Sequence, residues 1–237
     1  MSEFSFELLK NGVEICVSPE HKFGTDAFLL ADFASPRRKD SVCDLGTGCG
    51  IIPLLMQMKY DPKLIYCVDI QSQAIEQLNI TIEKNKLERL IPVCADLKEA
   101  WEGFPQSSLD VVTCNPPYKA ADAGMQSLGE AQRIARHEIM CSINDVCRAA
   151  ARMLKFGGRL CLCNRPERLA DVICAMRNNK IEPKLLRFVS KTPEDAPWLF
   201  LIEGRFGGNP FMKTLPPLFI QENGEASREL LKIYGQE

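Results

Sequence analysis

Metal-binding patterns are missing from this chain, although it is rich in cysteine. Only His21 and His137 among its 237 residues are histidines, and no two of its eleven cysteines form a Cys-x-x-Cys pair. Structural zinc sites need such clusters, so we expect no metal ion. Several cysteines, among them Cys43, Cys67 and Cys114, lie in apolar stretches, where a free thiol acts as a small hydrophobic side chain. We therefore expect the cysteines to be reduced and structural.

Long hydrophobic runs are missing as well. The longest, such as residues 51–56, are far too short to cross a bilayer, and Glu3 and Glu7 do not fit a secretory signal. We therefore expect a cytoplasmic protein that does not contact membranes. The composition, 46% hydrophobic and 25% charged, is that of a globular protein. The length predicts one domain over residues 1–237, with an N-terminal hairpin and entry segment over 1–35 and a core over 36–237. We favour a monomer.

Apolar runs and helical periods alternate through the middle of the chain. We expect strands at residues 42–45, 64–68, 91–95, 109–114 and 159–163, and helices at about 50–59, 71–86, 141–155 and 166–178. Alternation of this kind predicts an α/β fold in which helices cover both faces of a parallel sheet.

The N-terminal segment follows a different pattern. Residues 4–18 alternate around Asn11-Gly12, which predicts a hairpin with a two-residue turn. A short helix should follow, with Thr25 or Asp26 as its N-cap.

The pattern changes again after residue 179. Two strands, at 184–189 and 198–206, follow each other without a helical period between them. We expect them to pair antiparallel at one edge of the sheet. The tail contains Gly207-Gly208 and Pro216-Pro217, so it should form no long regular element.

The stretch Asn115-Pro116-Pro117-Tyr118 comes directly after the expected strand at 109–114. Prolines lack the N–H donors of a β-ladder, so the chain must leave the sheet here. Open α/β sheets bind ligands at this carboxyl end of their strands. Asn115 offers an acceptor and a donor on one planar group, and Tyr118 offers an aromatic face. Together they suit a planar amide or an aminated ring, and an Asn-capped turn with a core tyrosine is the structural alternative.

A glycine-rich loop, Asp44-Leu45-Gly46-Thr47-Gly48-Cys49-Gly50, follows the first expected strand of the core. Glycines let the backbone turn sharply and approach a ligand closely. The dinucleotide fingerprint Gly-x-Gly-x-x-Gly needs a glycine where Ile51 stands. Asp44 would also repel a phosphate, whereas it suits an amino group. The loop therefore fits a pyrophosphate ligand poorly.

Two further carboxylates end the next two expected strands. Asp69 can accept hydrogen bonds from both hydroxyls of an adenosine ribose, and Asp96 can accept one from an adenine amino group. Each of them alone could instead cap the helix that follows. Three acidic residues at the ends of three successive strands, beside a glycine loop, favour a shared ligand site.

The order of these motifs resembles the class I S-adenosylmethionine-dependent methyltransferases. The resemblance implies a Rossmann-like, seven-stranded, mostly parallel sheet with an antiparallel last strand, and S-adenosylmethionine as the cofactor. In that family Asn-Pro-Pro-Tyr marks transfer to a planar nitrogen, so Asn115, Pro116 and Tyr118 are the implied catalytic residues. The implied cofactor-binding residues are Thr25, Asp26, Asp44, Gly46, Gly48, Gly50, Asp69, Ile70, Asp96, Leu97 and Asn115.

A narrower resemblance covers almost the whole chain. Segments 22–27, 133–138, 201–204 and 215–218 are similar to the bacterial N6-adenine methyltransferases that modify the adenine beside the anticodon of a valine tRNA. This resemblance implies a tRNA partner. It also implies that Pro117, Arg133, Arg136 and His137 bind the substrate.

Charge is distributed unevenly along the chain. Residues 119–191 contain 14 Lys and Arg against 7 Asp and Glu, a net charge of +7, although the whole chain carries −2. Such a segment can attract an anionic partner, but solvated arginine faces of helices give the same count. Four alternative functions stay open: a protein glutamine N5-methyltransferase, a guanine-N2 rRNA methyltransferase, a dinucleotide oxidoreductase and a non-catalytic RNA-binding module.

Overall fold

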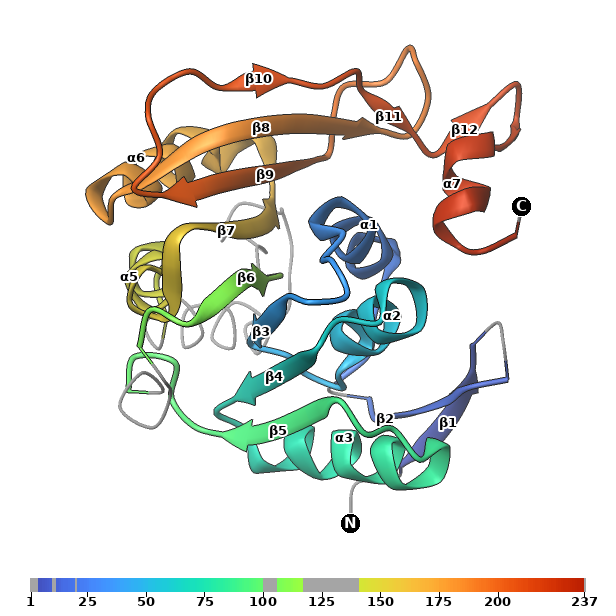
Figure 1. Ribbon diagram of the computed structural model, residues 1–237. Helices are drawn as coiled ribbons and strands as arrows, with labels where there is room; N and C mark the ends of the chain where they lie inside the picture. Colours follow the sequence, from blue (N-terminus) through green and yellow to red (C-terminus); the bar gives the residue numbers. More distant parts are fainter. Residues whose placement is uncertain (1–3, 10–11, 20, 100–105, 117–140, 237) are drawn as a thin grey trace, which may run out of the picture.

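One central sheet organises the chain (Figure 1). The computed structural model describes residues 4–9, 12–19, 21–99, 106–116 and 141–236. Within them the strand order is β10-β8-β9-β7-β6-β3-β4-β5, and β11 also pairs with β8. The strands are β3 (Ser41–Leu45), β4 (Leu64–Asp69), β5 (Leu90–Cys94), β6 (Leu109–Cys114), β7 (Leu154–Asn164), β8 (Ile181–Ser190), β9 (Leu199–Phe206), β10 (Lys213–Thr214) and β11 (Leu218–Phe219).

The directions of the strands agree with those predicted from the sequence. Strands β5, β4, β3, β6 and β7 are parallel neighbours, whereas β9 is antiparallel to both β7 and β8. The predicted mostly parallel sheet with an antiparallel last strand is therefore confirmed. The short strands β10 and β11 extend the sheet beyond β8.

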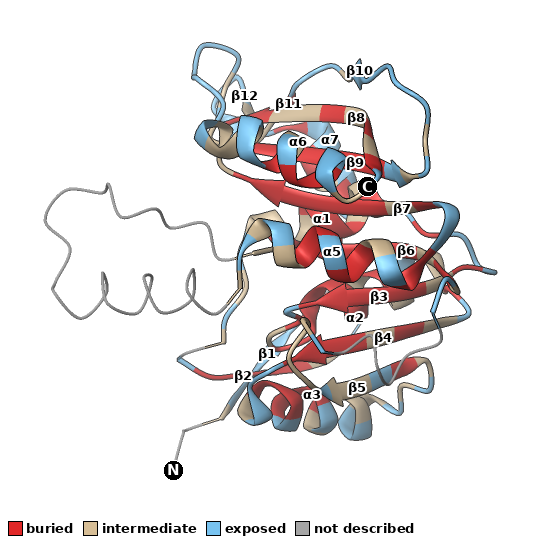
Figure 2. Ribbon diagram, turned by 90° about the vertical axis from the view of Figure 1, so that its left-hand side faces the viewer, coloured by how far each residue is buried: buried red, intermediate tan, exposed pale blue. Residues whose placement is uncertain are grey.

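Helices cover both faces of this sheet (Figures 1 and 2). Side chains along a strand alternate between the faces, so Val42 belongs to one apolar core and Cys43 to the other. Helices α1 and α2 pack on the first core, and α5 and α6 pack on the second. The bounds are α1 (Thr25–Ala34), α2 (Ile51–Tyr60), α3 (Ser72–Asn85), α5 (Ile143–Met153), α6 (Leu169–Asn178) and α7 (Arg228–Ile233), with a 3-10 turn η2 (Pro166–Arg168).

The N-terminal hairpin consists of β1 (Ser5–Leu8) and β2 (Glu14–Val17). Its last strand pair is Leu8 with Glu14, and beyond it the N–H of Leu9 donates to the carbonyl of Val13 at 2.7 Å. Three sequence positions separate Leu9 from Val13, so the predicted two-residue turn at Asn11-Gly12 is wrong. Asn11 lies outside the described residues. The N–H of Cys16 donates to Thr81 Oγ1 at 3.0 Å, which ties the hairpin to α3.

The largest differences from the predicted elements lie around β7. Helix α5 ends at Met153 and β7 begins at the next residue, so the predicted helix end at 155 and strand start at 159 are wrong. Gly157 has a φ of +78°, and the register between β6 and β7 shifts in this part of the strand. The glycines therefore form an irregularity within the strand and do not end it.

The tail after β9 contains only short elements, as predicted: β10, β11, the pair β12 (Gln221–Glu222) and β13 (Glu225–Ala226), and α7. Arg187 on β8 holds α7 through two hydrogen bonds to Glu229, of 2.7 and 2.8 Å. Tyr234 then reaches α1, where its ring packs edge-on against Phe28 with the centroids 4.7 Å apart. The tail therefore helps to fix the start of α1.

Candidate active site

Polar segments meet at the carboxyl ends of β3, β4, β5 and β6. These strands are parallel neighbours, so the residues that follow them emerge at one edge of the sheet. The glycine loop follows β3, Asp69 ends β4, Asp96 follows β5 and Asn115 follows β6. The fold thus brings together residues that the sequence spreads over some seventy positions.

The glycine loop gives this edge an open backbone surface. Gly46, Gly48 and Gly50 have φ angles of +70°, +54° and +82°, in the left-handed region that favours glycine. A Cβ added at Gly50 would lie 2.5 Å from Cδ1 of Leu78 on α3. Within the described residues, nothing lies within 4 Å of a Cβ added at Gly46 or Gly48. Gly50 therefore packs the loop onto α3, whereas Gly46 and Gly48 leave room for a ligand.

Asp69 fastens the glycine loop to β4. Its Oδ2 accepts a hydrogen bond from the N–H of Gly48 at 2.8 Å, and its Oδ1 accepts one from Gln71 at 3.0 Å. The N-cap of α3 is Gln71, so Asp69 does not occupy the cap position itself. A carboxylate has lone pairs beyond these two bonds and can accept from ligand hydroxyls as well.

Asp96 shapes the turn after β5. Its Oδ1 accepts from the N–H of Lys98 at 2.9 Å, and its backbone carbonyl accepts from Glu99 at 2.8 Å. The neighbouring apolar candidates differ in exposure. Ile70 is 47% exposed at the sheet edge, whereas Leu97 packs against the core on the side of α5 and α6.

Asp44 is a buried carboxyl that has only one of its oxygens paired. Its Oδ1 accepts from Thr113 Oγ1 on β6 at 2.6 Å, and its Oδ2 has no hydrogen-bond partner among the described residues. Burial, with a smaller contribution from the negative charge of Asp69, raises the pKa of the Asp44 carboxyl to about 7, against the opposing effects of the Thr113 and Thr47 hydroxyls. A cationic ligand group beside Asp44 would relieve both the desolvation and the missing hydrogen bond.

Two residues from distant parts of the chain hold the amide of Asn115. Its Nδ2 donates to Asp26 Oδ2 at 2.8 Å, and its Oδ1 accepts from Cys163 Sγ at 3.1 Å. Because a carboxylate only accepts, Asp26 determines which end of the amide carries the N–H groups. Burial raises the pKa of the Cys163 thiol, so this thiol stays protonated and donates. The amide of Asn115 is thus held in a single orientation.

The start of α1 differs from the prediction. The N-cap is Gly24, not Thr25 or Asp26, because the side chains of both candidates serve tertiary contacts. Asp26 accepts from Asn115, and Thr25 Oγ1 lies 3.0 Å from the hydroxyl oxygen of Tyr234.

No sequence motif indicated the contacts made by Cys163 and Thr113, which follow from strand register. In the β6–β7 pairing Cys114 lies opposite Leu162, so Asn115 and Cys163 are next to each other. In the β3–β6 pairing Asp44 lies opposite Thr113. Alignment of the parallel strands by their carboxyl ends is the signal that could have found both pairs.

Some predicted residues are not part of the described chain. Pro117, Tyr118, Arg133, Arg136 and His137 lie outside the described residues, so their roles stay predictions. All eleven cysteines are free. In the part of the chain that is described, no group of three His, Cys, Asp or Glu side chains could hold a metal ion. Nor does any helix described there have the length and apolar character needed to cross a membrane.

Comparisons with known sequences agree with this architecture. The family model of the methyltransferase small domain matches residues 21–175. A curated tRNA1(Val) (adenine(37)-N6)-methyltransferase from Parabacteroides distasonis is 28% identical over 182 residues, which cover 77% of this chain and 76% of the relative.

Solved structures share the fold. A predicted O-methyltransferase from Agrobacterium tumefaciens superimposes with a TM-score of 0.73 at 19% identity, covering 89% of this chain and 96% of that one. TYW2 from M. jannaschii, crystallised with AdoMet, gives a TM-score of 0.58 at 15% identity and covers 87% of each chain. The resemblance drawn from the sequence motifs is confirmed by the family match over most of the chain: it belongs to the methyltransferase small-domain family.

Proposed function

We propose that this protein transfers a methyl group from S-adenosylmethionine to the exocyclic N6 of an adenine in tRNA. The observation that carries the proposal is the oriented amide of Asn115, at a sheet edge that also holds an open glycine loop and three carboxylates. The names of the curated relatives support an adenine in tRNA as the acceptor.

The residues after β3, β4 and β5 fit S-adenosylmethionine, which supplies a methyl group activated on a sulfonium. Asp69 would accept from the ribose hydroxyls, and Asp96 would accept from the adenine amino group. The unpaired oxygen of Asp44 would accept from the amino group of the methionine part. The open backbone at Gly46 and Gly48 leaves space for this ligand.

The other predicted cofactor residues divide by their contacts. Gly50 acts by packing the loop on α3, and Leu97 acts within the core. Ile70 offers an exposed apolar surface beside Asp69, which suits the flat face of an adenine. We assign Thr25 and Asp26 to the side of the site where the methyl acceptor binds, because Asp26 contacts Asn115.

Asn115 would position the amine that is methylated. Its Oδ1 would accept one N–H of the amine and the carbonyl of Pro116 would accept the other, which favours a nitrogen whose lone pair faces the methyl group. Asp26 accepts from Nδ2 and thereby increases the negative charge on Oδ1. An amine conjugated with its ring is barely basic, so positioning matters more than a strong base. Tyr118 is the predicted stacking surface for the base.

Cations at the acceptor side support an RNA substrate. Arg165 follows β7 and Lys191 follows β8, and both strands end at the same edge of the sheet. Three other cations of segment 119–191 are paired with acids that lie outside it, so its net charge overstates the surface available to RNA; the pairs are Lys155–Asp110, Arg159–Glu203 and Arg187–Glu229. Arg133, Arg136 and His137 stay predicted RNA contacts, and a tRNA substrate places the enzyme in the cytoplasm.

One experiment tests the function directly. The protein is incubated with methyl-labelled S-adenosylmethionine and unmodified tRNA, and the labelled nucleoside is identified after digestion. We expect N6-methyladenosine, loss of the product when the RNA is first treated with RNase, and loss of activity in Asn115→Ala. Label in protein that resists RNase would instead indicate the glutamine N5-methyltransferase, and label in guanosine would indicate the guanine-N2 enzyme.

A further inference from the structure

A cleft of about 800 Å³ opens beside the Asp26–Asn115 pair. Asp26 lines it from the start of α1, Arg165 from the end of β7 and Lys191 from the end of β8. Trp198 and Asp195 line it from the loop that leads into β9. The residues after β3, β4 and β5 that we assign to the cofactor are absent from its described lining. The cleft therefore lies on the side of Asn115 where the methyl acceptor must enter.

We infer that this cleft binds the nucleotide next to the methylated adenine, with Trp198 stacked on its base and with Arg165 and Lys191 against its phosphate. The inference rests on the proposed RNA methyltransferase function. It adds a subsite that none of the sequence motifs indicated, because Arg165, Lys191 and Trp198 are separate residues that only the sheet brings together.

Trp198 and Arg165 form a unit that is built before any ligand binds. The guanidinium carbon of Arg165 lies 5.7 Å from the centroid of the Trp198 ring, and its Nη1 donates to the carbonyl of Trp198 at 3.0 Å. The N–H of Trp198 donates to Val189 at the end of β8 at 3.0 Å. The Trp198 side chain is partly buried against the core on the side of α1. A guanidinium has five donors in a fixed fork, so it can keep its backbone contact while it meets a phosphate.

The acidic residues of the cleft are used by the protein itself. Asp195 Oδ2 accepts from the N–H and the hydroxyl of Thr192, at 3.1 and 2.9 Å, and these bonds shape the loop before β9. Asp26 accepts from Asn115. Both carboxylates therefore have structural partners, and we assign the phosphate and the base of the ligand to the two cations and the indole.

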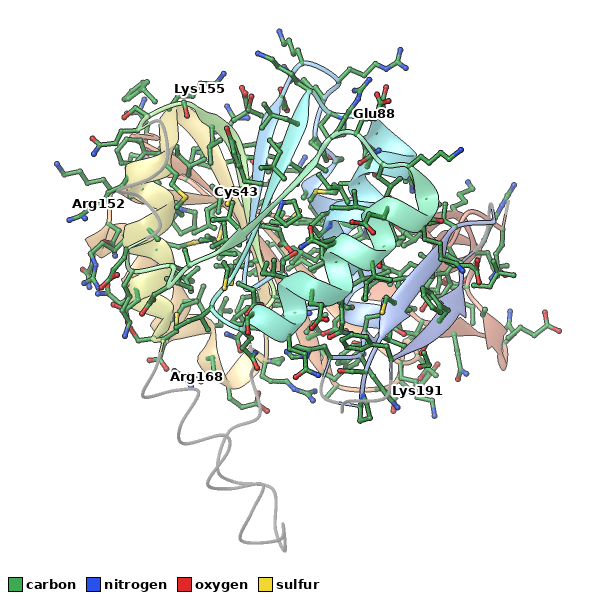
Figure 3. All side chains as sticks on the ribbon, turned by 90° about the horizontal axis from the view of Figure 1, so that it is seen from below. Cys43, Glu88, Arg152, Lys155, Arg168 and Lys191 are labelled. Atoms are coloured by element: carbon green, nitrogen blue, oxygen red, sulfur yellow. The ribbon has the colours of Figure 1, made fainter. Side chains whose placement is uncertain are left out.

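Among the lysines in and beside β8, Lys191 is the one placed for this role. Lys184 in the same strand donates to the carbonyls of Asn209 and Pro210, at 2.9 and 3.0 Å, and so holds the tail. Lys180 precedes the strand and Lys191 follows it, so they lie at opposite edges of the sheet. Figure 3 shows Lys191 at the same end of the molecule as Arg168, which follows β7, and far from Lys155 at the start of β7.

The chemistry of this cleft matches what an RNA loop presents when one base leaves its stack. Withdrawal of the target adenine into the site exposes the face of the neighbouring base, and an aromatic side chain can replace the lost stacking. Stacking of a base on an aromatic residue changes affinity by roughly 5- to 100-fold. Each lysine or arginine that meets a phosphate steepens the dependence of binding on salt.

The test is a double-mutant cycle that combines protein variants with RNA variants, and it requires only measurements of binding affinity. The probes are three synthetic anticodon-loop RNAs that contain the target adenine. One RNA is intact, and the other two are abasic at the position before or after the target. Affinities are measured for wild type, Trp198→Ala and Trp198→Phe. We expect Trp198→Ala to weaken binding of the intact RNA by roughly 5- to 100-fold and to leave binding of one abasic RNA unchanged. Trp198→Phe should keep most of the affinity.

The cations have a matched pair of variants. Lys191→Gln should weaken RNA binding and lower the slope of log affinity against log salt by about one, while Lys180→Gln at the other end of the same strand should change neither. Equal losses of Trp198→Ala on intact and on both abasic RNAs, or identical salt slopes for the two lysine variants, would overturn the subsite. If the wild-type protein methylates tRNA but the cycle shows no coupling between Trp198 and the neighbouring base, the subsite is wrong and the proposed function stands. If the cycle shows this coupling but the protein does not methylate tRNA, the RNA-binding subsite stands and the proposed function is wrong.

Discussion

Asp26 Oδ2 accepts a hydrogen bond from Asn115 Nδ2 at 2.8 Å, although 89 residues separate the two in the sequence. Asp26 lies in the first turn of α1, where the partial positive charge of a helix N-terminus stabilises a carboxylate. The orientation of the Asn115 amide is therefore set by a helix that precedes the whole sheet. We regard Asp26 as a positioning residue that acts through Asn115.

The first prediction concerns Asn115 itself. Asn115→Ala removes an acceptor that is aimed at the reacting amine, and methyl transfer should fall at least about 100-fold, the scale of losing one preorganised polar contact. The cofactor should bind nearly as well as before, because the glycine loop and Asp69 are untouched. Single-turnover rates and calorimetric titration of the cofactor measure the two effects separately. A variant with wild-type rates would remove Asn115 from the mechanism.

The second prediction concerns Asp26. Asp26→Ala should lower kcat by roughly 10- to 100-fold with little change in KM for tRNA, because the amide loses its fixed orientation and part of its charge. Asp26→Asn keeps an acceptor oxygen and should recover part of the loss. The double variant with Asn115→Ala should be no slower than Asn115→Ala alone, since Asp26 acts through that amide. If Asp26→Ala instead weakens cofactor binding as much as it lowers kcat, Asp26 binds the cofactor, as the family resemblance implied.

A third prediction addresses the ribose contact. Asp69→Ala should weaken S-adenosylmethionine binding by about 2–4 kcal/mol, because it removes charge-assisted hydrogen bonds to the ligand. It also removes the bond to the N–H of Gly48, so the free protein should melt at a lower temperature. Asp69→Asn keeps an oxygen for one of these bonds, so its cofactor affinity and melting temperature should lie between those of wild type and Asp69→Ala. Unchanged cofactor affinity in a folded Asp69→Ala would show that this residue only fixes the loop.

The sequence was sufficient for the order of strands and helices because each of those elements carries its own period and its own ends. The Asn-Pro-Pro stop and the glycine loop likewise mark strand ends, and these placed Asp44, Asp69, Asp96 and Asn115 at one edge. The motifs were therefore enough to predict the fold and the family before any contact was known.

Contacts between distant segments were not predictable in the same way. The link from Asp26 to Asn115 depends on how α1 lies over the sheet, and the link from Cys163 to Asn115 depends on strand register. Helix capping failed at Thr25 and Asp26 for the same reason, because tertiary partners outcompeted the local one. The cleft with Arg165 and Trp198 required the antiparallel return of β9, whose position beside β7 no local pattern specifies.

A fourth prediction follows from the buried carboxyl of Asp44. Its folded-state pKa of about 7 lies above the ordinary value of 3.8, so the protonated form is the one that folding favours. The stability that this group contributes is present below pH 3.8 and is lost progressively as the pH rises to about 7. The melting temperature of the free protein, relative to that of Asp44→Asn, should therefore fall across this range and then stay level. Cofactor affinity should rise over the same range, since its cationic amino group favours the ionised carboxylate; equal pH profiles for the two proteins would contradict the assignment.

The last prediction separates the packing glycine from the ligand-facing one. Gly50→Ala places a Cβ 2.5 Å from Leu78 Cδ1 at a φ of +82°, so it combines a clash with a strained backbone and should destabilise the fold by roughly 1–3 kcal/mol. Gly48→Ala has the strain at φ +54° but meets open space, so its loss of stability should be smaller. The order should reverse for the cofactor, because a methyl group at Gly48 occupies the space beside Asp69 where the ligand would lie. Urea unfolding gives the first comparison and calorimetry gives the second. A Gly48→Ala variant that binds the cofactor like wild type would mean that the open side of this loop faces solvent and not the cofactor.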